Sequence, residues 1–458
     1  MEDKGGRQSN FPQSEIAYVV AVNMGYGHER PAHVLKSLAV NQEVVIANDY
    51  EGIPDLDRTL WESGRKWYER ISRFKRVPLV GHLVFKAMDE IQEIAPFYPR
   101  RDLSRPSLQT RQLYYLIRQK HHMRHLIEKL AEKPKPILST FMSPAFAAEE
   151  FGYPEEIYAL CTDADVNRAW APMNPKSSRI RYFAPNGRVV ERLKLYGVKE
   201  RNIELTGFPL PVEAIGGVEP QVVVEDLSRR ICNLDPQGIF MSHSEKMLSA
   251  YLGPLTCDTI SKTKPKSVRM AFAIGGAGAQ REIGITIAHS LRREIRQGKI
   301  ILDLIAGTRP EVASYFETEL KKMSLSTALK KGYVNVLYAK DRPTYFDAFS
   351  GLMRKIDILW TKPSELSFYT GLGIPIIIAP TVGSQEDYNR QWLNQVGGGI
   401  DQLDPRYTNE WLFDWINSGA LARLAWNGFI EAPTHGAYRI SDVLLGGRNT
   451  IHDLPLVV

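Results

Sequence analysis

Short apolar runs alternate with longer stretches of helical pattern along most of the chain. In the first half these runs read IAYVVAVN (16–23), EVVIAN (43–48), PILSTF (136–141), IYALC (157–161) and RIRYFA (179–184). Strands buried on both faces have this continuous apolar character, and helices between them are typical of a parallel sheet. The pattern therefore predicts an α/β fold with a doubly wound, Rossmann-like sheet in this half.

The second half repeats the design after a gap. Its apolar runs read VRMAFAIGG (268–276), KIILDLIAG (299–307), VNVLYA (334–339), DILW (357–360) and IPIIIAP (374–380), with a helix expected near 281–297. The same reasoning predicts a second doubly wound sheet.

A stretch rich in proline and glycine, residues 206–220, separates the halves and is the candidate hinge. We expect an N-terminal Rossmann-like domain over 14–212, a helical connection over 213–266 and a C-terminal Rossmann-like domain over 267–430. Residues 431–458 would form a tail that packs back on the N-terminal domain.

Length and composition agree with a folded chain of two domains. The 458 residues exceed the size at which one hydrophobic core usually stops growing. The polar start and the lack of a long apolar run favour neither secretion nor a membrane span, so we expect a cytoplasmic protein. The cysteines Cys161, Cys232 and Cys257 lack metal-ligand spacing, and their odd number favours reduced thiols.

The charge is distributed unevenly. The formal net charge is +6, yet residues 61–125 hold 14 Lys and Arg against 6 Asp and Glu. Aromatic residues such as Trp61, Tyr98 and Tyr115 lie among these charges. The mixture suits an anionic membrane surface or an amphiphilic ligand, or equally a solvated helical face over a core. Nucleic acid is a weaker interpretation because no recognition module accompanies the charge, and we expect none as a partner.

Three histidines in the same basic region, His121, His122 and His125, are expected at the surface of an amphipathic helix rather than at a metal site. The sequence also contains no P-loop, HExxH or GxSxG pattern.

A glycine-rich turn joins the first strand of the second half to a helix. It places Gly275, Gly276 and Gly278 where a diphosphate could approach the backbone and the helix N-terminus. Such turns also occur where glycine only permits tight packing. Asp303 lies inside the following strand and not at its end, which argues against a nicotinamide dinucleotide.

Polar residues follow the next two strands of this half. They should emerge at the carboxyl edge of the sheet, where open α/β sheets bind ligands. Carboxylates and amides there suit ribose and sugar hydroxyls, and a lysine would offset diphosphate charge. Helix capping by Ser364 and Glu365 and a structural hydrogen bond at Asn389 are the alternatives. The residues are Thr361, Lys362, Ser364, Glu365, Gly383, Ser384, Gln385, Glu386 and Asn389.

The first half offers its own candidates. GYGH (25–28) forms a second glycine turn with His28 at a helix start, where a histidine could act as a base, contact phosphate or serve structure only. Asp163 and Asp165 follow the strand that ends at Cys161. Either could accept a proton from a hydroxyl or cap the loop.

At these motifs the chain resembles glycosyltransferases of the monogalactosyldiacylglycerol synthase and processive diacylglycerol glucosyltransferase group, and more distantly the lipid II N-acetylglucosaminyltransferase. GYGHERPAHVL (25–35) is similar to that group's GGGH opening, and TDADVNRAW (162–170) to its TD…H…W segment. The segment 183–210 closes on the group's TG-x-P, and IGGAGAQ (274–280), TKPSE and GSQEDYN (383–389) match its donor motifs.

The resemblance implies a GT-B fold, with two Rossmann-like domains facing an interdomain cleft. The N-terminal domain would hold the acceptor and the C-terminal domain a nucleotide-sugar, usually a UDP-sugar. It implies inverting, metal-independent transfer to a hydroxyl acceptor, with no cofactor, and leaves the acceptor as a possible lipid or amphiphile at a membrane surface.

Roles for individual residues follow from the matched motifs. Gly25, Gly27 and His28 would line the cleft, with His28 the foremost catalytic or phosphate contact. Gly275, Gly276 and Gly278 would meet the diphosphate and Glu365 the ribose. The transferred sugar would contact Gln385, Glu386 and Asn389.

The chain departs from the group at Tyr26, where a glycine is usual, at Asn167, where the histidine is usual, and in a shortened turn after Thr361. Two alternatives therefore stay open. One is a UDP-sugar 2-epimerase, which shares the two-Rossmann plan, and the other a non-catalytic nucleotide-sugar-binding or scaffold protein.

Overall fold

The computed structural model describes residues 11, 15–74, 94–253, 257, 267–275, 280–381 and 383–447. The chain divides into two compact units. The N-terminal unit comprises residues 12–209, 383–389 and 435–458, and the C-terminal unit comprises residues 1–11, 210–382 and 390–434.

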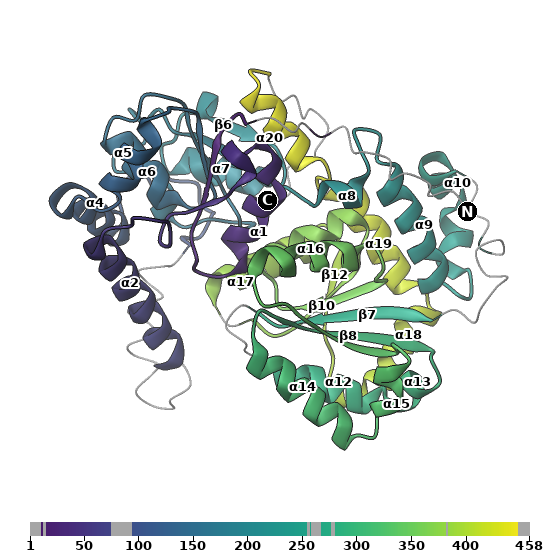
Figure 1. The fold of residues 1–458 in the computed structure, drawn as a ribbon. Coiled ribbons are helices and arrows are strands. Elements are labelled where there is room, and N and C mark those ends of the chain that lie inside the picture. Colours follow the sequence, from purple (N-terminus) through teal and green to yellow (C-terminus); the bar gives the residue numbers. More distant parts are fainter. Residues whose placement is uncertain are drawn as a thin grey trace, which may run out of the picture. The chain divides into compact units, whose positions relative to one another are not determined.

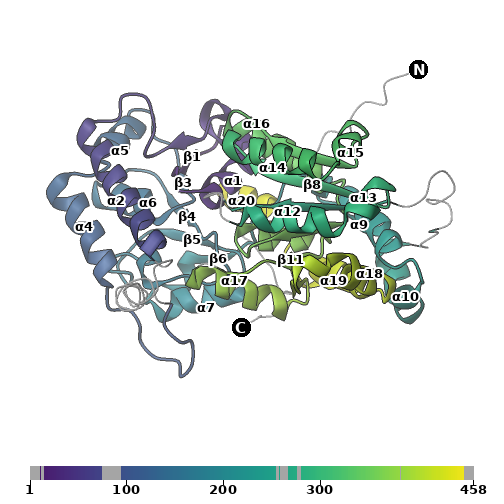
Figure 2. The same ribbon diagram turned by 90° about the horizontal axis from the view of Figure 1, so that it is seen from below.

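The N-terminal unit is built on a six-stranded sheet in the order β2-β1-β3-β4-β5-β6, with all neighbours parallel. Figure 2 shows β1, β3, β4, β5 and β6 in this succession. Its strands are β1 (Tyr18–Ala21), β2 (Val45–Ile46), β3 (Ile137–Ser139), β4 (Ile157–Leu160), β5 (Arg181–Ala184) and β6 (Ile203–Leu205).

Helices connect these strands. They are α1 (Tyr26–Val34), α2 (Asp55–Phe74), α4 (Leu108–Lys120), α5 (Arg124–Ala131), α6 (Met142–Glu150), α7 (Gly187–Leu195) and the late helix α20 (Gly436–Leu444). Short 3₁₀ turns are η1 (Lys36–Leu38), η2 (Val40–Gln42), η3 (Arg168–Trp170) and η4 (Glu200–Asn202). The helix α20 returns to this unit, where Arg439 Nη1 donates to the Thr206 carbonyl at 3.0 Å.

The C-terminal unit has a second parallel sheet, in the order β12-β11-β10-β7-β8-β9. The strands are β7 (Val268–Ala273), β8 (Ile300–Gly307), β9 (Val334–Tyr338), β10 (Ile358–Thr361), β11 (Ile376–Ile378) and β12 (Gly399–Asp401). Every residue of β10 and β11 is buried, as expected for strands covered on both faces. Figure 1 shows α12 and α14 on one face of this sheet and α16 on the other.

The helices of this unit are α8 (Val212–Ile215), α9 (Gln221–Leu234), α10 (Ile239–Leu252), α12 (Arg281–Ser290), α13 (Arg292–Arg296), α14 (Pro310–Lys322), α15 (Ser326–Lys330), α16 (Arg342–Met353), α18 (Thr408–Asn417) and α19 (Ala420–Glu431). The 3₁₀ helices are η5 (Glu365–Leu372) and η6 (Pro405–Tyr407). The helix α17 (Ser384–Gln395) has its first six residues in the N-terminal unit.

The predicted fold class is confirmed in its two doubly wound, Rossmann-like domains, each built on a six-stranded parallel sheet. Each predicted strand is present, most of them with a shortened end, and β10 is shifted by one residue from the predicted 357–360. The sequence pattern missed β6 and β12, which lie at sheet edges and have only three residues each. Strands so short carry too few residues for an apolar run to stand out.

The segment expected as a helical connection is part of the C-terminal core. Leu227 and Ile231 of α9 are fully buried in the same apolar cluster as the sheet. Arg230 is also buried, and its guanidinium donates to the carbonyls of Met353, Ile356 and Leu372. These bonds fix α9 against the ends of α16 and η5, so α9 cannot serve as a free linker.

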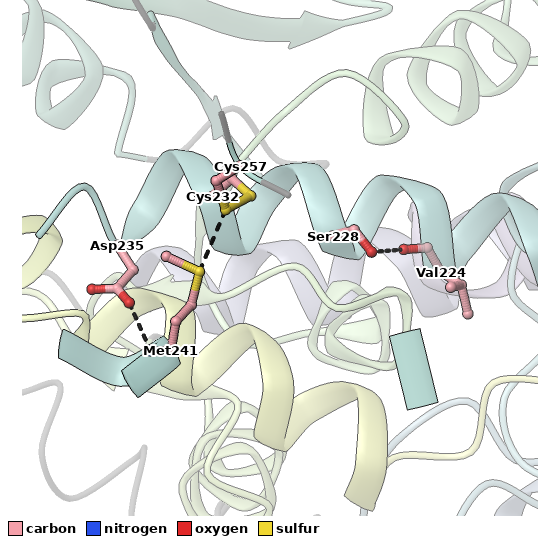
Figure 3. The surroundings of a disulfide bond; sticks show 6 residues. All are labelled: Val224, Ser228, Cys232, Asp235, Met241 and Cys257. Carbon is pink, nitrogen blue, oxygen red and sulfur yellow. Dashed lines mark hydrogen bonds between the residues drawn. A yellow bond between two sulfur atoms is a disulfide. The ribbon is translucent and has the colours of Figure 1, made fainter. Parts of the chain in front are cut away.

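The expectation of three reduced cysteines is wrong for two of them. Cys232 of α9 and Cys257 form a disulfide, and the Sδ of Met241 lies 3.4 Å from Cys257 Sγ (Figure 3). The pairing escaped the spacing argument because the two residues are 25 positions apart in the sequence. Cys161 stays a buried thiol, and burial raises its pKa well above the ordinary value.

No helix among the described residues combines the length and apolar character needed to cross a bilayer.

A thiol count tests the disulfide. Unfolded in guanidinium without reductant, the protein should expose one reactive thiol, and three after reduction, because Cys232 and Cys257 are paired and Cys161 is not. The folded protein should react slowly, since a buried, protonated thiol is a poor nucleophile. Absorbance with a thiol reagent measures this, and Cys161→Ser should remove the single signal. Three thiols before reduction would contradict the pairing.

Candidate functional site

The strand order of the C-terminal sheet reverses between β10 and β7. In open α/β sheets the chain connections leave such a point toward opposite faces, and ligands bind at the carboxyl ends of the two strands, an edge called here the crevice. β7 and β10 are in register, with Ala273 beside Thr361, and Thr361 Oγ1 donates to the Ala273 carbonyl at 3.2 Å. The residues after these two therefore emerge side by side.

Gly275 and Lys362 meet at this crevice. A Cβ placed on Gly275 would lie 2.3 Å from Lys362 Cε and 3.2 Å from its Nζ, so the lysine side chain runs directly across the glycine. Glycine at this position leaves room for the lysine side chain to lie across the backbone. The arrangement brings a cation to the start of the glycine-rich turn. Gly276 and Gly278, predicted to share in diphosphate binding, lie outside the described residues.

The turn after β10 continues with Ser364 and Glu365. Ser364 is the N-cap of η5, and its Oγ accepts from the Leu366 amide at 3.4 Å. Glu365 is the first residue of η5 and is 7% exposed. Capping, the alternative weighed for Ser364, is thus present in the structure.

One further contact at this edge was not predicted. Gln280 Nε2 donates to the Pro380 carbonyl at 2.7 Å, which ties the end of the glycine-rich turn to the segment after β11. Its signal in the sequence was only its place in IGGAGAQ, because an amide that bonds a backbone carbonyl leaves no motif of its own.

Residues Gly383–Asn389 follow β11 in sequence, but they belong to the N-terminal unit. Gly383 lies at the start of α17, where its carbonyl accepts from the Glu386 amide. Ser384, Gln385 and Glu386 form the first turn of that helix.

Asn389 is 1% exposed and is bonded within the N-terminal unit. Its Oδ1 accepts from the Ala164 amide at 2.7 Å, and its Nδ2 donates to Asp163 Oδ1 at 3.1 Å. The structural hydrogen bond weighed as an alternative to sugar binding is therefore present at this residue.

The N-terminal sheet has its own reversal, between β1 and β3. After β1 the chain turns at Gly25, which has φ +129° and precedes α1. A side chain is strained at this φ, so glycine is required for the turn. Gly27 and His28 then form the first turn of α1, at the carboxyl edge of the sheet.

His28 is held by residues that follow β3 and β4. Its Nδ1 lies 2.9 Å from the Thr140 carbonyl and 3.2 Å from Thr162 Oγ1, while Thr140 Oγ1 donates to the His28 carbonyl at 2.7 Å. A carbonyl oxygen can only accept, so Nδ1 carries the proton and the lone pair of the neutral ring is on Nε2. Thr140 and Thr162 were not predicted as partners, although Thr140 lies in the predicted strand 136–141 and Thr162 directly follows the predicted strand 157–161.

Asp163 and Asp165 have different surroundings, although they are two residues apart. Asp163 is half-buried and accepts from Asn389. Asp165 is 1% exposed, with both oxygens bonded to Arg192 and one also to Arg188 at 2.9 Å. Both oxygens of this buried carboxylate are already taken up by the two guanidiniums, so the structure does not favour Asp165 as a base.

Asn167 occupies the position of the resembling group's histidine. Its Oδ1 accepts from the Ala169 amide, and it caps η3. In this chain the position serves the local backbone.

The basic segment 61–125 is only partly described, since residues 75–93 lie outside. Tyr98 and Tyr115 are well exposed there. The expectation that His122 lies at the surface is wrong: it is 3% exposed, and its Nδ1 lies 2.8 Å from Asp57 Oδ1. A buried carboxylate from α2, 65 residues away, was not visible in the local pattern.

Comparisons with known proteins add the following. A family described as a domain of unknown function (DUF6938) matches residues 257–425, which span the C-terminal sheet. No curated protein matches the chain.

Several solved structures match the chain structurally at low sequence identity. The S. aureus MnaA–UDP co-structure is 12% identical, with 97% of this chain and 100% of that chain covered, at a TM-score of 0.46. MurG of Acinetobacter baumannii is 10% identical, with 94% of this chain and 99% of that chain covered, at a TM-score of 0.40. The UDP-GlcNAc 2-epimerase of Neisseria meningitidis bound to UDP-GlcNAc is 12% identical, with 71% of this chain and 80% of that chain covered, at a TM-score of 0.39. Likenesses of this size do not carry those proteins' activities over to this chain.

The two aspartates give a matched test of the N-terminal unit. Asp165→Asn should lower its free energy of unfolding by about 3 kcal/mol, because the substitution leaves two guanidiniums without their buried carboxylate. Asp163→Asn keeps an acceptor for Asn389 and should cost under about 1 kcal/mol. Thermal unfolding should separate them by roughly 5 to 10 °C. Equal melting temperatures would contradict the structural role of Asp165.

Proposed function

We propose that the protein is a glycosyltransferase that moves a sugar from a nucleotide-sugar, of the UDP type, to a hydroxyl acceptor. The observation that carries the proposal is the contact of Lys362 with Gly275 at the strand reversal of the C-terminal sheet. There a cation and a glycine-rich turn adjoin the N-terminus of α12. The ordered resemblance of the motifs to glycosyltransferases supports it.

In this proposal the C-terminal unit holds the donor. The lysine ammonium would pair with the diphosphate, and turn amides with the helix N-terminus would add hydrogen bonds and a partial positive charge. The dipole alone contributes only about 0.3 to 1 kcal/mol, so the ammonium is the larger contributor. Glu365 would accept hydrogen bonds from the ribose.

His28 would serve as the base in this proposal. The acceptor oxygen attacks the anomeric carbon, the bond from that carbon to the diphosphate oxygen breaks, and the acceptor proton moves to Nε2 of the neutral ring. The leaving diphosphate takes the electron pair, and Lys362 stabilises its charge. The stereochemistry is inverting because the attack comes from the side opposite the leaving group.

The acceptor is inferred to be amphiphilic. Exposed apolar side chains in the described part of the basic segment, Tyr98, Leu108 and Tyr115, support this, since they lie among arginines that would favour an anionic lipid surface.

Donor binding tests the C-terminal site. UDP at about 100 times its dissociation constant should stabilise the protein by roughly 2.7 kcal/mol, seen as a raised melting temperature, and GDP, ADP and dTDP should do less. Lys362→Met should weaken UDP binding by roughly 10-fold or more, because a charged hydrogen bond is lost. Lys321→Met on the exposed face of α14 is the control and should bind normally. If no nucleotide raises the melting temperature, the proposal fails.

Turnover tests His28. With a UDP-sugar and diacylglycerol in anionic vesicles, His28→Gln should lower kcat by about 10² to 10⁴ while UDP still raises the melting temperature as in the wild type. Release of UDP and formation of glycolipid measure this. Conversion of UDP-N-acetylglucosamine without any acceptor would favour a 2-epimerase instead, and binding without turnover a non-catalytic protein.

A further inference from the structure

A groove of about 370 Å³ lies in the C-terminal unit beside α16, over the face of the sheet formed by β7, β8 and β9. This volume falls within the range of small-molecule sites, about 300 to 1,000 Å³. Its polar lining comes from the early residues of β7 and β9, Arg269 and Asn335, and from the middle of β8. It is therefore separate from the carboxyl edge where Lys362 lies.

The helix α16 leaves the groove open through a missing side chain. Ala348 and Gly351 lie three residues apart on one face of α16, Lys355 follows in the turn just after the helix, and all three line the groove. A Cβ added at Gly351 would meet nothing within 4 Å. A glycine inside a helix weakens it, and here no close neighbour requires one. Open space therefore lies over Gly351 beside the groove, and departures from local sequence preference are expected at functional or strained sites.

A carboxylate paired with an arginine and an asparagine lines the groove. Asp303 is 3% exposed, and it accepts from Arg269 Nε at 2.7 Å, from Arg269 Nη2 at 2.9 Å and from Asn335 Nδ2 at 3.0 Å. The carboxylate raises the pKa of Arg269, which stays charged. Strand register explains the cluster, because Asp303 lies beside Asn335 in the β8–β9 pair.

The groove has a net positive lining. Arg269 engages Asp303 with Nε and Nη2, and its Nη1 bonds to none of the described residues. The Arg269 side chain is 27% exposed, so part of the guanidinium reaches solvent. Lys355 adds a second cation, against the single carboxylate of Asp303. Apolar surface beside these cations comes from Leu337 and Leu352.

We propose that this groove binds a small organic anion, a carboxylate or phosphate monoester joined to an apolar group. The anion pairs with Arg269 and Lys355, and the apolar group fills the space over Gly351 against Leu337 and Leu352. The site does not rest on the proposed glycosyl transfer, because none of its residues belongs to the donor edge.

Direct binding of defined probes tests the site. Phenyl phosphate and benzoate are titrated into the full chain with UDP present, and saturation-transfer NMR reports binding. At least one anion should bind saturably, and benzyl alcohol and benzylammonium should bind more weakly. If neither anion saturates, or if benzylammonium binds as well as benzoate, the proposal is overturned.

Two variants locate the probe. Gly351→Leu fills the groove and should weaken binding of the anion by roughly 10-fold or more, whereas the matched Gly351→Ala should bind within about twofold of the wild type. Lys355→Met removes an exposed cation and should weaken binding by a few fold, which keeps the test decisive should Gly351→Leu fail to fold. Unchanged binding in folded Gly351→Leu or in Lys355→Met would place the probe elsewhere and overturn the proposal.

Discussion

Helices that leave a parallel sheet toward opposite faces open a crevice at the carboxyl ends of the strands that they follow, and each sheet of this chain has one such point. In the N-terminal sheet it lies between β1 and β3, and in the C-terminal sheet between β7 and β10. The candidate chemistry sits at these two points because the strands around them are buried and in register. Lys362 directly follows β10, and His28 lies in the first turn of the helix that follows β1.

Glycines and threonines lie beside the candidate residues His28 and Lys362. Gly25 is set by its φ, and Gly275 by the lysine that crosses it. The threonines that hold His28 use a carbonyl and hydroxyls rather than a carboxylate.

The sequence predicted the fold well because its signal is continuous apolar strands, and β4, β10 and β11 have just that character. It predicted less where the outcome depended on distant partners. Asn389 has the amide expected of a sugar ligand, yet its partners come from the loop after β4, about 225 residues away. His122 and Cys232 were misjudged for the same reason, since Asp57 and Cys257 are brought to them only by the tertiary structure.

Arg230 shows how a single buried group changes the meaning of a segment. A guanidinium without a bonded carboxylate is tolerated in the core because three carbonyls accept hydrogen bonds from it. Burial lowers the pKa of Arg230 only to about 10, so the side chain stays charged at neutral pH. Those carbonyls end α16, precede β10 and end η5. Because η5 carries Glu365 and β10 leads to Lys362, the hydrogen bonds from α9 hold the segments on which these two residues lie. The helices that follow the change of unit at Leu210 thus belong to the C-terminal unit and do not form a separate connection between the domains.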